Sequence, residues 1–511
     1  MSDKLRLKLG KTYLKLVNRL PQFRGGFVRA LQDIADHHKK QAHDTYKSSR
    51  PPKDVTLEFL YFRSTEVFNL EDFDQLQRGL FRLFPDLKNE FFYRFAGKEF
   101  TKQTESMHGS GSGILGYVLR DKTMRWFGMD VKREIPTLPP EVDFVEVWYH
   151  KILPSVILIT LDVHLTEEAN RSLMSVQERH YEPAIRFTNI VPWLAPRRSY
   201  SVSHSESEMR NAVLGWLEAL RGRVEDCFRP FLAGYFTKQA VDEVVRLPTV
   251  EVYALKGAPE EIQAFGEWAR TSSRQWLDSL GFSFFLDVYT DEDSVFTIPD
   301  RFVTKQSSAY RLVVLWDRYV QSVGTDMHGG NEKRAIKYNT RYALDAFSRL
   351  IALHELLNSI QRTVARLRRV AFRSMHRTRG LGQFMRLSKV ILRESILLDR
   401  IPMEFKQNKR LIEYAARAID GFKEVRPDFG KVEEETFPAN VIAGLEERMQ
   451  SLKEQVEHIK QTFSDFLVLK NMRSLYILQW IVLILSIIAI LTNWPNIKQF
   501  LIDIRELLLL T

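Results

Sequence analysis

The sequence predicts a cytosolic α+β domain, followed by a long-helix and coiled-coil region and one C-terminal transmembrane helix. Three observations predict this order. β-Branched and aromatic runs alternate with helical patterns up to about residue 323, residues 332–377 contain neither proline nor glycine, and residues 475–492 carry no charge. The predicted fold is therefore a globular part joined by long helices to an apolar end.

The composition excludes two classes of protein. Hydrophobic residues make up 44% of the 511 residues, which is too many for a disordered chain, and a single cysteine, Cys227, rules out an internal disulfide scaffold. The net charge of +10 is concentrated at the start, because residues 1–53 hold 13 Lys and Arg against 4 Asp and Glu. A high overall charge is thus weak support for nucleic-acid binding, which is not expected.

The sequence divides into six expected parts. In chain order these are basic amphipathic N-terminal helices (1–53), an α+β cytosolic domain (54–323), a long-helix bundle (331–440), a coiled coil (441–474), the transmembrane helix (475–492) and an amphipathic interfacial tail (493–511). A loop-like stretch near 190–205 leaves open whether the α+β domain consists of two subdomains.

Strands are expected where β-branched and aromatic residues cluster between turn signals. The expected strands are 55–62, 142–150, 155–165, 249–255, 283–290, 294–298 and 310–316, with helical stretches near 70–84, 167–180, 206–240 and 259–279. Short connections join several of these strands, so hairpins mixed with helices are expected, which is the α+β pattern.

A heptad repeat of apolar residues predicts the coiled coil. Its members follow a three-four spacing without interruption: Ile442, Leu445, Met449, Leu452, Val456, Ile459, Phe463 and Phe466. Such a seam must lie against another helix. The sequence leaves open whether that helix is 332–377 of the same chain or belongs to a second chain.

The stretch 475–492 has the length and composition of a transmembrane helix, with twelve Leu, Ile and Val residues. Lys470 and Arg473 before it, Tyr476 near its start and Trp494 just after it are the expected membrane-interface anchors. More positive residues precede the stretch than follow it. A single-pass membrane location is therefore expected, with the large N-terminal part in the cytoplasm and the short tail on the far side.

The long helix and the stretch LVLKNMRSLYILQWIVLILSIIAIL give the chain a layout that resembles the CorA-like divalent-cation transporter superfamily. This resemblance covers roughly residues 50–495 and implies a homo-oligomer, in that family a pentamer. The family carries Gly-Met-Asn after its first membrane helix, followed by a second membrane helix. Here Asn493-Trp494-Pro495 and an amphipathic tail stand in their place, so no selectivity residue is carried over.

Two sets of polar residues are candidate binding sites. Gln479, Ser486 and Asn493 are spaced by seven and form a polar stripe on the apolar helix, suited to lining a pore or to hydrogen bonding between helices. The second set lies on one flank of the long helix and is suited to binding a phosphate from a nucleotide or a lipid headgroup, or to facing solvent. Its members are Arg362, Arg366, Arg369 and Arg373.

No catalytic motif is present, so the chain is not expected to be an enzyme, and no cofactor is implied, with a divalent cation left open. The first functional hypothesis is a membrane-anchored homo-oligomer. In it a cytosolic sensing domain is coupled through long helices to a membrane segment, and ion conduction is left open. The alternatives are a single-pass membrane tether or scaffold, and a nucleotide-responsive membrane effector. The expected partners are the lipid bilayer, further copies of the chain and an anionic ligand.

Overall fold

The computed structural model describes residues 51–84, 112–120, 123–126, 129–132, 137–179, 181, 184–187, 200–203, 205–239, 247–259, 268, 274–280, 288–291, 294–297, 309–323, 329–376, 400–425, 432–492, 498 and 504–505. The chain forms two compact units. The first, here the sheet unit, comprises residues 1–356 and 403–445, and the second, the helical unit, comprises 357–402 and 446–511. The basic N-terminal helices expected at 1–53 fall almost wholly outside the described residues.

A ten-stranded mixed sheet forms the centre of the sheet unit. Its spatial order is β14 (Val432–Thr436), β13 (Lys423–Val425), β10 (Val288–Thr290), β11 (Ser294–Thr297), β12 (Ala309–Leu315), β9 (Thr249–Lys256), β1 (Thr56–Asn69), β6 (Val156–Leu165), β5 (Val142–Leu153) and β2 (Ser112–Leu119). Neighbouring strands are antiparallel except β9 and β12, which run parallel. Two further hairpins pair β3 (Thr123–Trp126) with β4 (Met129–Lys132) and β7 (Ala184–Phe187) with β8 (Tyr200–Ser203).

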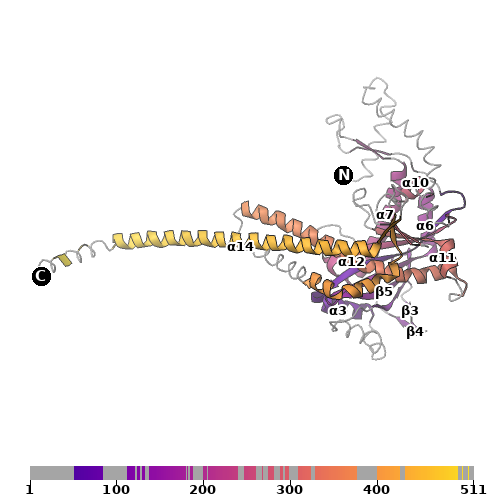
Figure 1. Ribbon diagram of the computed structural model, residues 1–511, viewed down its shortest axis with the longest axis horizontal. Coiled ribbons are helices and arrows are strands. Elements are labelled where there is room, and N and C mark those ends of the chain that lie inside the picture. The colour runs from indigo at the N-terminus through magenta and orange to yellow at the C-terminus, as the bar shows by residue number, and fades with distance from the viewer. Residues whose placement is uncertain are drawn as a thin grey trace, which may run out of the picture. The chain divides into compact units, whose positions relative to one another are not determined.

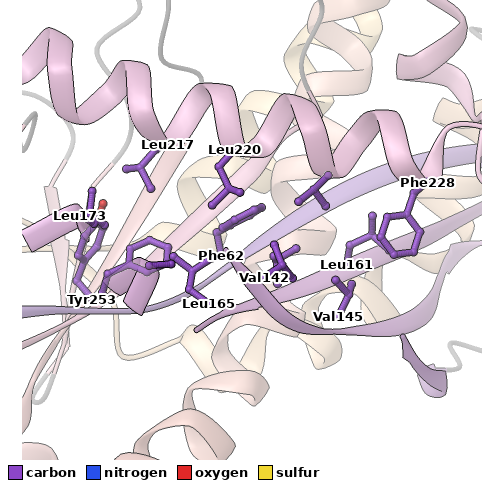
Figure 2. Packing of buried hydrophobic residues seen from close by; sticks show 14 of the residues in the cluster. Phe62, Val142, Val145, Leu161, Leu165, Leu173, Leu217, Leu220, Phe228 and Tyr253 are labelled. Atoms are coloured by element: carbon purple, nitrogen blue, oxygen red, sulfur yellow. The ribbon is translucent and has the colours of Figure 1, made fainter. Parts of the chain in front are cut away.

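One face of the central strands carries the hydrophobic core. Because side chains alternate along a strand, Phe62, Val145 and Leu161 point to the same side, where α7 (Ser205–Phe228) covers them with Leu217 and Leu220 (Figure 2). We call this the α7 face. The other described helices that precede α12 are α3 (Phe73–Leu83), α6 (Glu167–Glu178), α8 (Tyr235–Gln239), α10 (Arg274–Ser279) and α11 (Trp316–Val323). Short 3₁₀ turns lie at Leu70–Asp72 and, after α12, at Arg417–Ile419.

The opposite face packs against α12 (Glu332–His376), a helix of 45 residues. We call it the α12 face. At one end of it the rings of Phe296 and Phe347 stack with centroids 3.9 Å apart, and Phe437 meets both rings at 5.1 Å. Phe437 is the first residue of α14 (Phe437–Thr492), a continuous helix of 56 residues (Figure 1). The start of α14 is therefore fixed in the core of the sheet unit.

The heptad seam of α14 is covered within a single chain. Met449, Leu452 and Val456 are buried in the helical unit, and Arg448 Nη1 donates a hydrogen bond of 2.7 Å to Asn358 Oδ1 of α12. Leu357, Ile360 and Val364 are the buried residues of that part of α12. In this structure the seam from Ile442 to Ile459 is therefore buried by residues of its own chain, which is one of the two alternatives that the sequence left open.

The predicted C-terminal transmembrane helix is wrong. Among the residues that the structure describes, no helix is long and apolar enough to cross a membrane. A span needs about 20 apolar residues. Most of the predicted interfacial tail, 493–511, lies outside the described residues.

Candidate functional site

A row of ionisable side chains on α12 faces the sheet. Its members recur every fourth residue and so lie on one side of the helix: Lys333, Lys337, Arg341, Asp345 and Arg349. Charged and polar side chains on the α12 face of β1, β5 and β6 lie opposite them. We call the α12 residues and these partners the ionic row.

Arg63 of β1 forms the most deeply buried part of the ionic row. Its Nε and Nη2 atoms donate to the two carboxylate oxygens of Asp162 on β6 at 2.5 and 2.6 Å, and its Nη1 donates to Asp345 of α12. The side chains of Arg63 and Asp162 are 0% and 1% exposed. Burial by itself would lower the pKa of Arg63, but the two carboxylates outweigh burial and raise it. The guanidinium group therefore stays charged and joins two strands to the helix.

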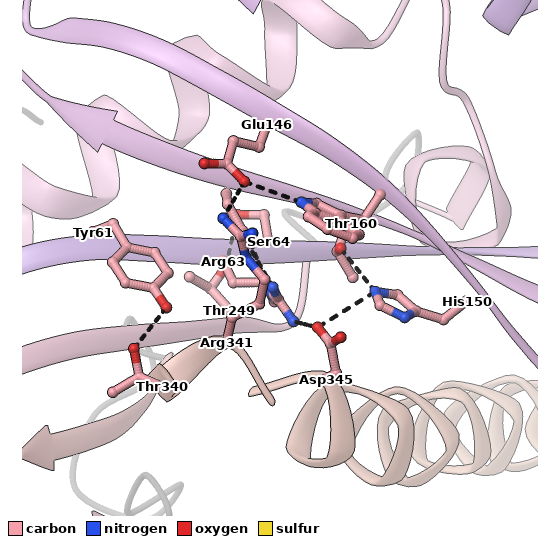
Figure 3. Close-up of polar contacts among 12 residues, drawn as sticks. Tyr61, Arg63, Ser64, Glu146, His150, Thr160, Thr249, Thr340, Arg341 and Asp345 are labelled. Carbon is pink, nitrogen blue, oxygen red and sulfur yellow. Dashed lines mark hydrogen bonds and ion pairs between the residues drawn. The ribbon is translucent and has the colours of Figure 1, made fainter. Parts of the chain in front are cut away.

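His150 of β5 completes this end of the ionic row (Figure 3). Its Nε2 lies 3.2 Å from Thr160 Oγ1 and 3.8 Å from Asp345 Oδ1, and the ring is fully buried. Burial lowers the pKa of His150 to about 3, against the pull of Asp345. The imidazole is therefore neutral at physiological pH, so it adds no positive charge beside Arg63.

Glu146 of β5 binds Arg341, the middle member of the α12 residues in the ionic row. Arg341 Nη2 donates to Glu146 Oε2 at 2.5 Å, Trp148 Nε1 donates to the same oxygen at 3.2 Å, and the Arg341 guanidinium stacks 4.7 Å from the Trp148 ring centroid. Burial raises the pKa of Glu146, but His164 and Arg341 outweigh burial and hold it below its usual range. The carboxylate is thus ionised and fixed in orientation.

His164 of β6 and Lys337 of α12 lie beside Glu146. The His164 ring is held between Tyr61, with centroids 5.0 Å apart, and Phe144, at 4.2 Å. Its Nδ1 lies 3.5 Å from Lys337 Nζ, and its Nε2 lies 3.5 Å from Glu146 Oε1, beyond good hydrogen-bonding geometry. Burial lowers the pKa of His164 and, with the nearby charge of Lys333, lowers the pKa of Lys337 to about 8.

Direct helix-to-sheet contacts flank these charges. Tyr61 Oη lies 3.1 Å from Thr340 Oγ1, and Lys333 Nζ donates to Glu58. Tyr310 of β12 donates to Glu355 of α12 at 2.8 Å. Polar contacts thus continue along α12 over several turns, so a shift of α12 along the sheet would break them together.

A further buried carboxylate, Glu66, lies on the α7 face. Glu66 accepts hydrogen bonds from the backbone N–H groups of Phe236 and Thr237 at 2.8 and 3.0 Å, at the first turn of α8. Gly234 makes this approach possible, because a Cβ atom there would lie 2.4 Å from Val67 O and 2.6 Å from the Glu66 side chain. Burial raises the pKa of Glu66 to about 7, although its hydrogen bonds act in the opposite direction. The group fixes α8 on β1.

A small cavity lies at the far end of the ionic row. It has a volume of about 10 Å³, room for one water molecule, and is lined by Lys151 and Arg349 among apolar residues of α12 and the helical stretch 400–416. No group of three His, Cys, Asp or Glu side chains in the described part of the chain is arranged to hold a metal ion. A larger cofactor does not fit this cavity.

The sequence-predicted site residues lie elsewhere. Arg362, Arg366 and Arg369 are exposed on α12, and Arg362 Nε donates to Asn358 O at 3.4 Å. The side chain of Arg373 is outside the described residues. The arginines thus share a helix with the ionic row but do not contribute to it.

The predicted polar stripe is described only in part. Gln479 and Ser486 are exposed on α14, where Ser486 Oγ donates to Val482 O at 2.8 Å, so this hydroxyl is bonded to its own helix. Tyr476 is exposed with its ring centroid 6.1 Å from that of Trp480. Asn493, Trp494 and the side chains of Lys470 and Arg473 are outside the described residues.

Sequence reasoning missed the ionic row, although two signals for it were present. Charged residues interrupt otherwise apolar strand runs, as Arg63 does in LEFLYFRSTEVF and Asp162 in ILITLDVHL. The four-residue spacing of charges on α12 was the second signal. Neither pattern states which strand faces which helix, so the pairing needed the structure.

Comparisons with known proteins give no relative. No protein-family model, curated protein or solved structure matches this chain. The resemblance to CorA-like transporters therefore remains an expectation based on layout, and function has to be argued from the geometry.

Proposed function

We propose that this chain is a membrane-attached sensor that self-assembles, in which the sheet unit is coupled through α12 and α14 to an apolar segment that binds a lipid bilayer. One observation carries the proposal. α14 runs without interruption from Phe437, packed in the aromatic core of the sheet unit, to a segment in which every large apolar side chain that the structure describes is exposed. A structural change at the start of α14 can therefore reach that segment.

The apolar segment of α14 supports attachment to lipid. The ten large apolar side chains described in this segment are 48% to 59% exposed: Tyr476, Leu478, Trp480, Ile481, Val482, Leu483, Ile484, Leu485, Ile487 and Ile488. They occupy every side of the helix, so packing against one neighbouring helix would leave most of them in water. Removing them from water is favourable by about 10 kcal/mol in total, at roughly 1 kcal/mol for each half-exposed side chain. Lipid covers all sides at once.

The ionic row supports a sensing role for the sheet unit. Charged contacts of Arg63, Glu146 and Asp345 fix the register between α12 and three strands. A change in any of these residues leaves the charge of its partner unpaired. Buried ion pairs are suited to such a register because a mismatch leaves an unpaired buried charge. Ligand binding or a charge change in the sheet unit would thus bias the position of α12.

The proposal keeps self-assembly but not the pore. Self-assembly is kept in the proposal because the layout resembles a homo-oligomeric superfamily, and a mass measurement in mild detergent tests it. A pore lined by Gln479 and Ser486 required a membrane-spanning helix and is not carried forward.

Vesicle flotation tests lipid attachment. The purified full-length chain is mixed with vesicles of phosphatidylcholine and phosphatidylglycerol and centrifuged through a density gradient. We expect the chain to float with the vesicles and a variant carrying Leu483→Ser, Ile484→Ser and Leu485→Ser to float much less. Exposed apolar residues on 400–416 provide the matched control, Met403→Ser, Leu411→Ser and Tyr414→Ser, which should float like the unmodified chain. Loss of flotation in the control but not in the α14 variant would overturn the proposal.

Hydrogen exchange separates a sensor from a tether. In a sensor, vesicle binding changes the exchange rates of α12 and β1 as well as those of the apolar segment. In a tether or scaffold, only the apolar segment becomes protected. Unchanged exchange throughout the ionic row would therefore favour the tether.

A further inference from the structure

Lys337 occupies a distinctive place in the ionic row. It lies one turn from Lys333 on one side and one turn from Arg341 on the other, and its Nζ lies 3.5 Å from Nδ1 of His164. The residue is half-buried, so part of it faces solvent. The lysine amine thus meets an imidazole nitrogen at the edge of a buried polar network.

The imidazole lies between the lysine amine and a fixed carboxylate. His164 Nε2 faces Glu146 Oε1 at 3.5 Å, and Arg341 and Trp148 hold the other oxygen of Glu146. The rings of Tyr61 and Phe144 prevent the imidazole from turning. A proton on Nε2, the nitrogen that faces the carboxylate, leaves the Nδ1 lone pair directed at the lysine amine.

The surroundings of Lys337 favour its neutral form. Burial and the positive charge of Lys333 lower the pKa of Lys337 to about 8, while Glu58 on β1 and Glu146 and Asp143 on β5 act in the opposite direction. At pH 7.5 an amine with this pKa is roughly one quarter neutral, against about 0.1% for an ordinary lysine. A neutral amine is the nucleophilic form.

We propose that Lys337 is a modification site that accepts an acyl group from an activated donor such as an acyl phosphate or a thioester. The neutral amine nitrogen attacks the donor carbonyl carbon and forms the new N–C bond. The C–O or C–S bond of the donor breaks, and the leaving group departs with the electron pair. The proton lost from nitrogen passes to His164 Nδ1 and from there to solvent. The products are an amide at Lys337, the leaving-group anion and one proton released to solvent, which a thiolate leaving group then takes up, so the step balances without an oxidant or reductant.

Acylation would change the balance of charge in the ionic row. It removes the cation between Lys333 and Arg341 and places a bulkier neutral amide against His164. The positive charge of Lys337 lowers the pKa of His164, so that pKa rises once the lysine is acylated. The modification thus alters the contact between α12 and β6 at the point where the helix meets the sheet.

Competitive acetylation of the full-length chain tests the proposal. The chain is treated with a limiting amount of acetyl phosphate between pH 6 and pH 10, and the rate at each lysine is measured by peptide mass spectrometry. We expect Lys337 to react about tenfold faster than Lys333, its neighbour on the same helix, at pH 7.5, with a midpoint near pH 8. A Lys337 rate equal to or below that of Lys333, or a midpoint above pH 10, would overturn it.

Two variants test whether His164 and Glu146 assist the loss of the proton from the Lys337 amine. His164→Asn removes the proton acceptor and Glu146→Gln removes the charge that orients it, so both should slow Lys337 without changing the rate at Lys333. His458→Gln, a substitution of an exposed histidine on α14 outside the ionic row, should leave both rates unchanged. Circular dichroism confirms that each variant is folded, and if one is not, the other carries the test. Unchanged Lys337 rates in the folded variants would refute the proton-accepting role of His164.

Discussion

Arg63 is the residue at which the balance of buried charge is easiest to disturb. Its guanidinium group satisfies Asp162, which is 1% exposed, and also Asp345. Arg63→Met would keep much of the side-chain volume but leave Asp162 as an unpaired buried carboxylate. We expect the free energy of unfolding to fall by about 3–5 kcal/mol, measured by urea denaturation followed by circular dichroism.

An exposed arginine provides the control for that measurement. Arg171 lies 3.8 Å from Glu167 on α6, and the two side chains are 77% and 91% exposed. Arg171→Met should cost less than about 0.5 kcal/mol, because an exposed pair at this spacing contributes little. Equal losses for the two variants would mean that burial does not distinguish these ion pairs.

His150 gives the stability of the chain a defined pH dependence. Its pKa is about 3 in the folded chain and about 6.5 when unfolded, so the unfolded state binds more protons between these values. The contribution of His150 to the free energy of unfolding is therefore fully present above pH 6.5. It is lost as the pH falls toward 3, by about 1.4 kcal/mol for each pH unit.

Comparing variants separates the contribution of His150 from that of the carboxylates, which also titrate at acidic pH. His150→Gln should show a smaller loss of unfolding free energy than the unmodified chain between pH 6.5 and pH 4.5. His458→Gln, at an exposed position on α14, should follow the unmodified chain. If the curves for His150→Gln and the unmodified chain run parallel, His150 is not buried in its neutral form.

At the scale of elements, local patterns predicted several strands, missed others such as β2 and β14, and did not predict their order. The runs at 142–150, 155–165 and 249–255 correspond to β5, β6 and β9, because β-branched density and turn signals are local properties. The parallel pairing of β12 with β9 depends on contacts between residues about 60 positions apart, which no local pattern encodes. The ionic row was missed for the same reason.

The transmembrane error has a comparable origin. Residues 475–492 were judged by composition alone, and the same apolar composition suits any surface that must leave water. The described helix offers exposed apolar side chains without a membrane-spanning length. Composition therefore predicted the need for an apolar environment but not the form of that environment.

The pairing of α12 with α14 makes a prediction at this scale. Leu452 is 2% exposed in the seam, so Leu452→Ala should remove buried methyl groups and lower the free energy of unfolding by about 2–4 kcal/mol. Leu411, which is 38% exposed, is the matched site, and Leu411→Ala should cost less than about 1 kcal/mol.

Light scattering adds a second measurement to the same variants. Because the seam is covered by the chain itself, Leu452→Ala should leave the mass of the particle in mild detergent unchanged. A drop in mass would place the seam between chains and contradict the arrangement in which Arg448 bonds to Asn358 of its own chain.

For the whole molecule, the two ends of α14 have separate roles. Phe437 packs on Phe296 and Phe347 inside the sheet unit, whereas the apolar segment near the other end has no described cover. Stability of the sheet unit should therefore depend on the start of α14 and not on its end. The need of the chain for detergent or lipid should instead depend on the end of α14 and not on its start.

Truncation tests this division. A chain that ends at Arg473 should stay monodisperse without detergent while the full-length chain aggregates, because about 10 kcal/mol of apolar exposure has been removed. The melting temperature of the sheet unit should be the same for both chains in detergent. Phe437→Ala should lower it, with a loss of about 3–5 kcal/mol from the cavity left beside Phe347. If the truncated chain still aggregates without detergent, the exposed segment is not what drives association with an apolar surface, and lipid attachment would have to reside elsewhere in the chain.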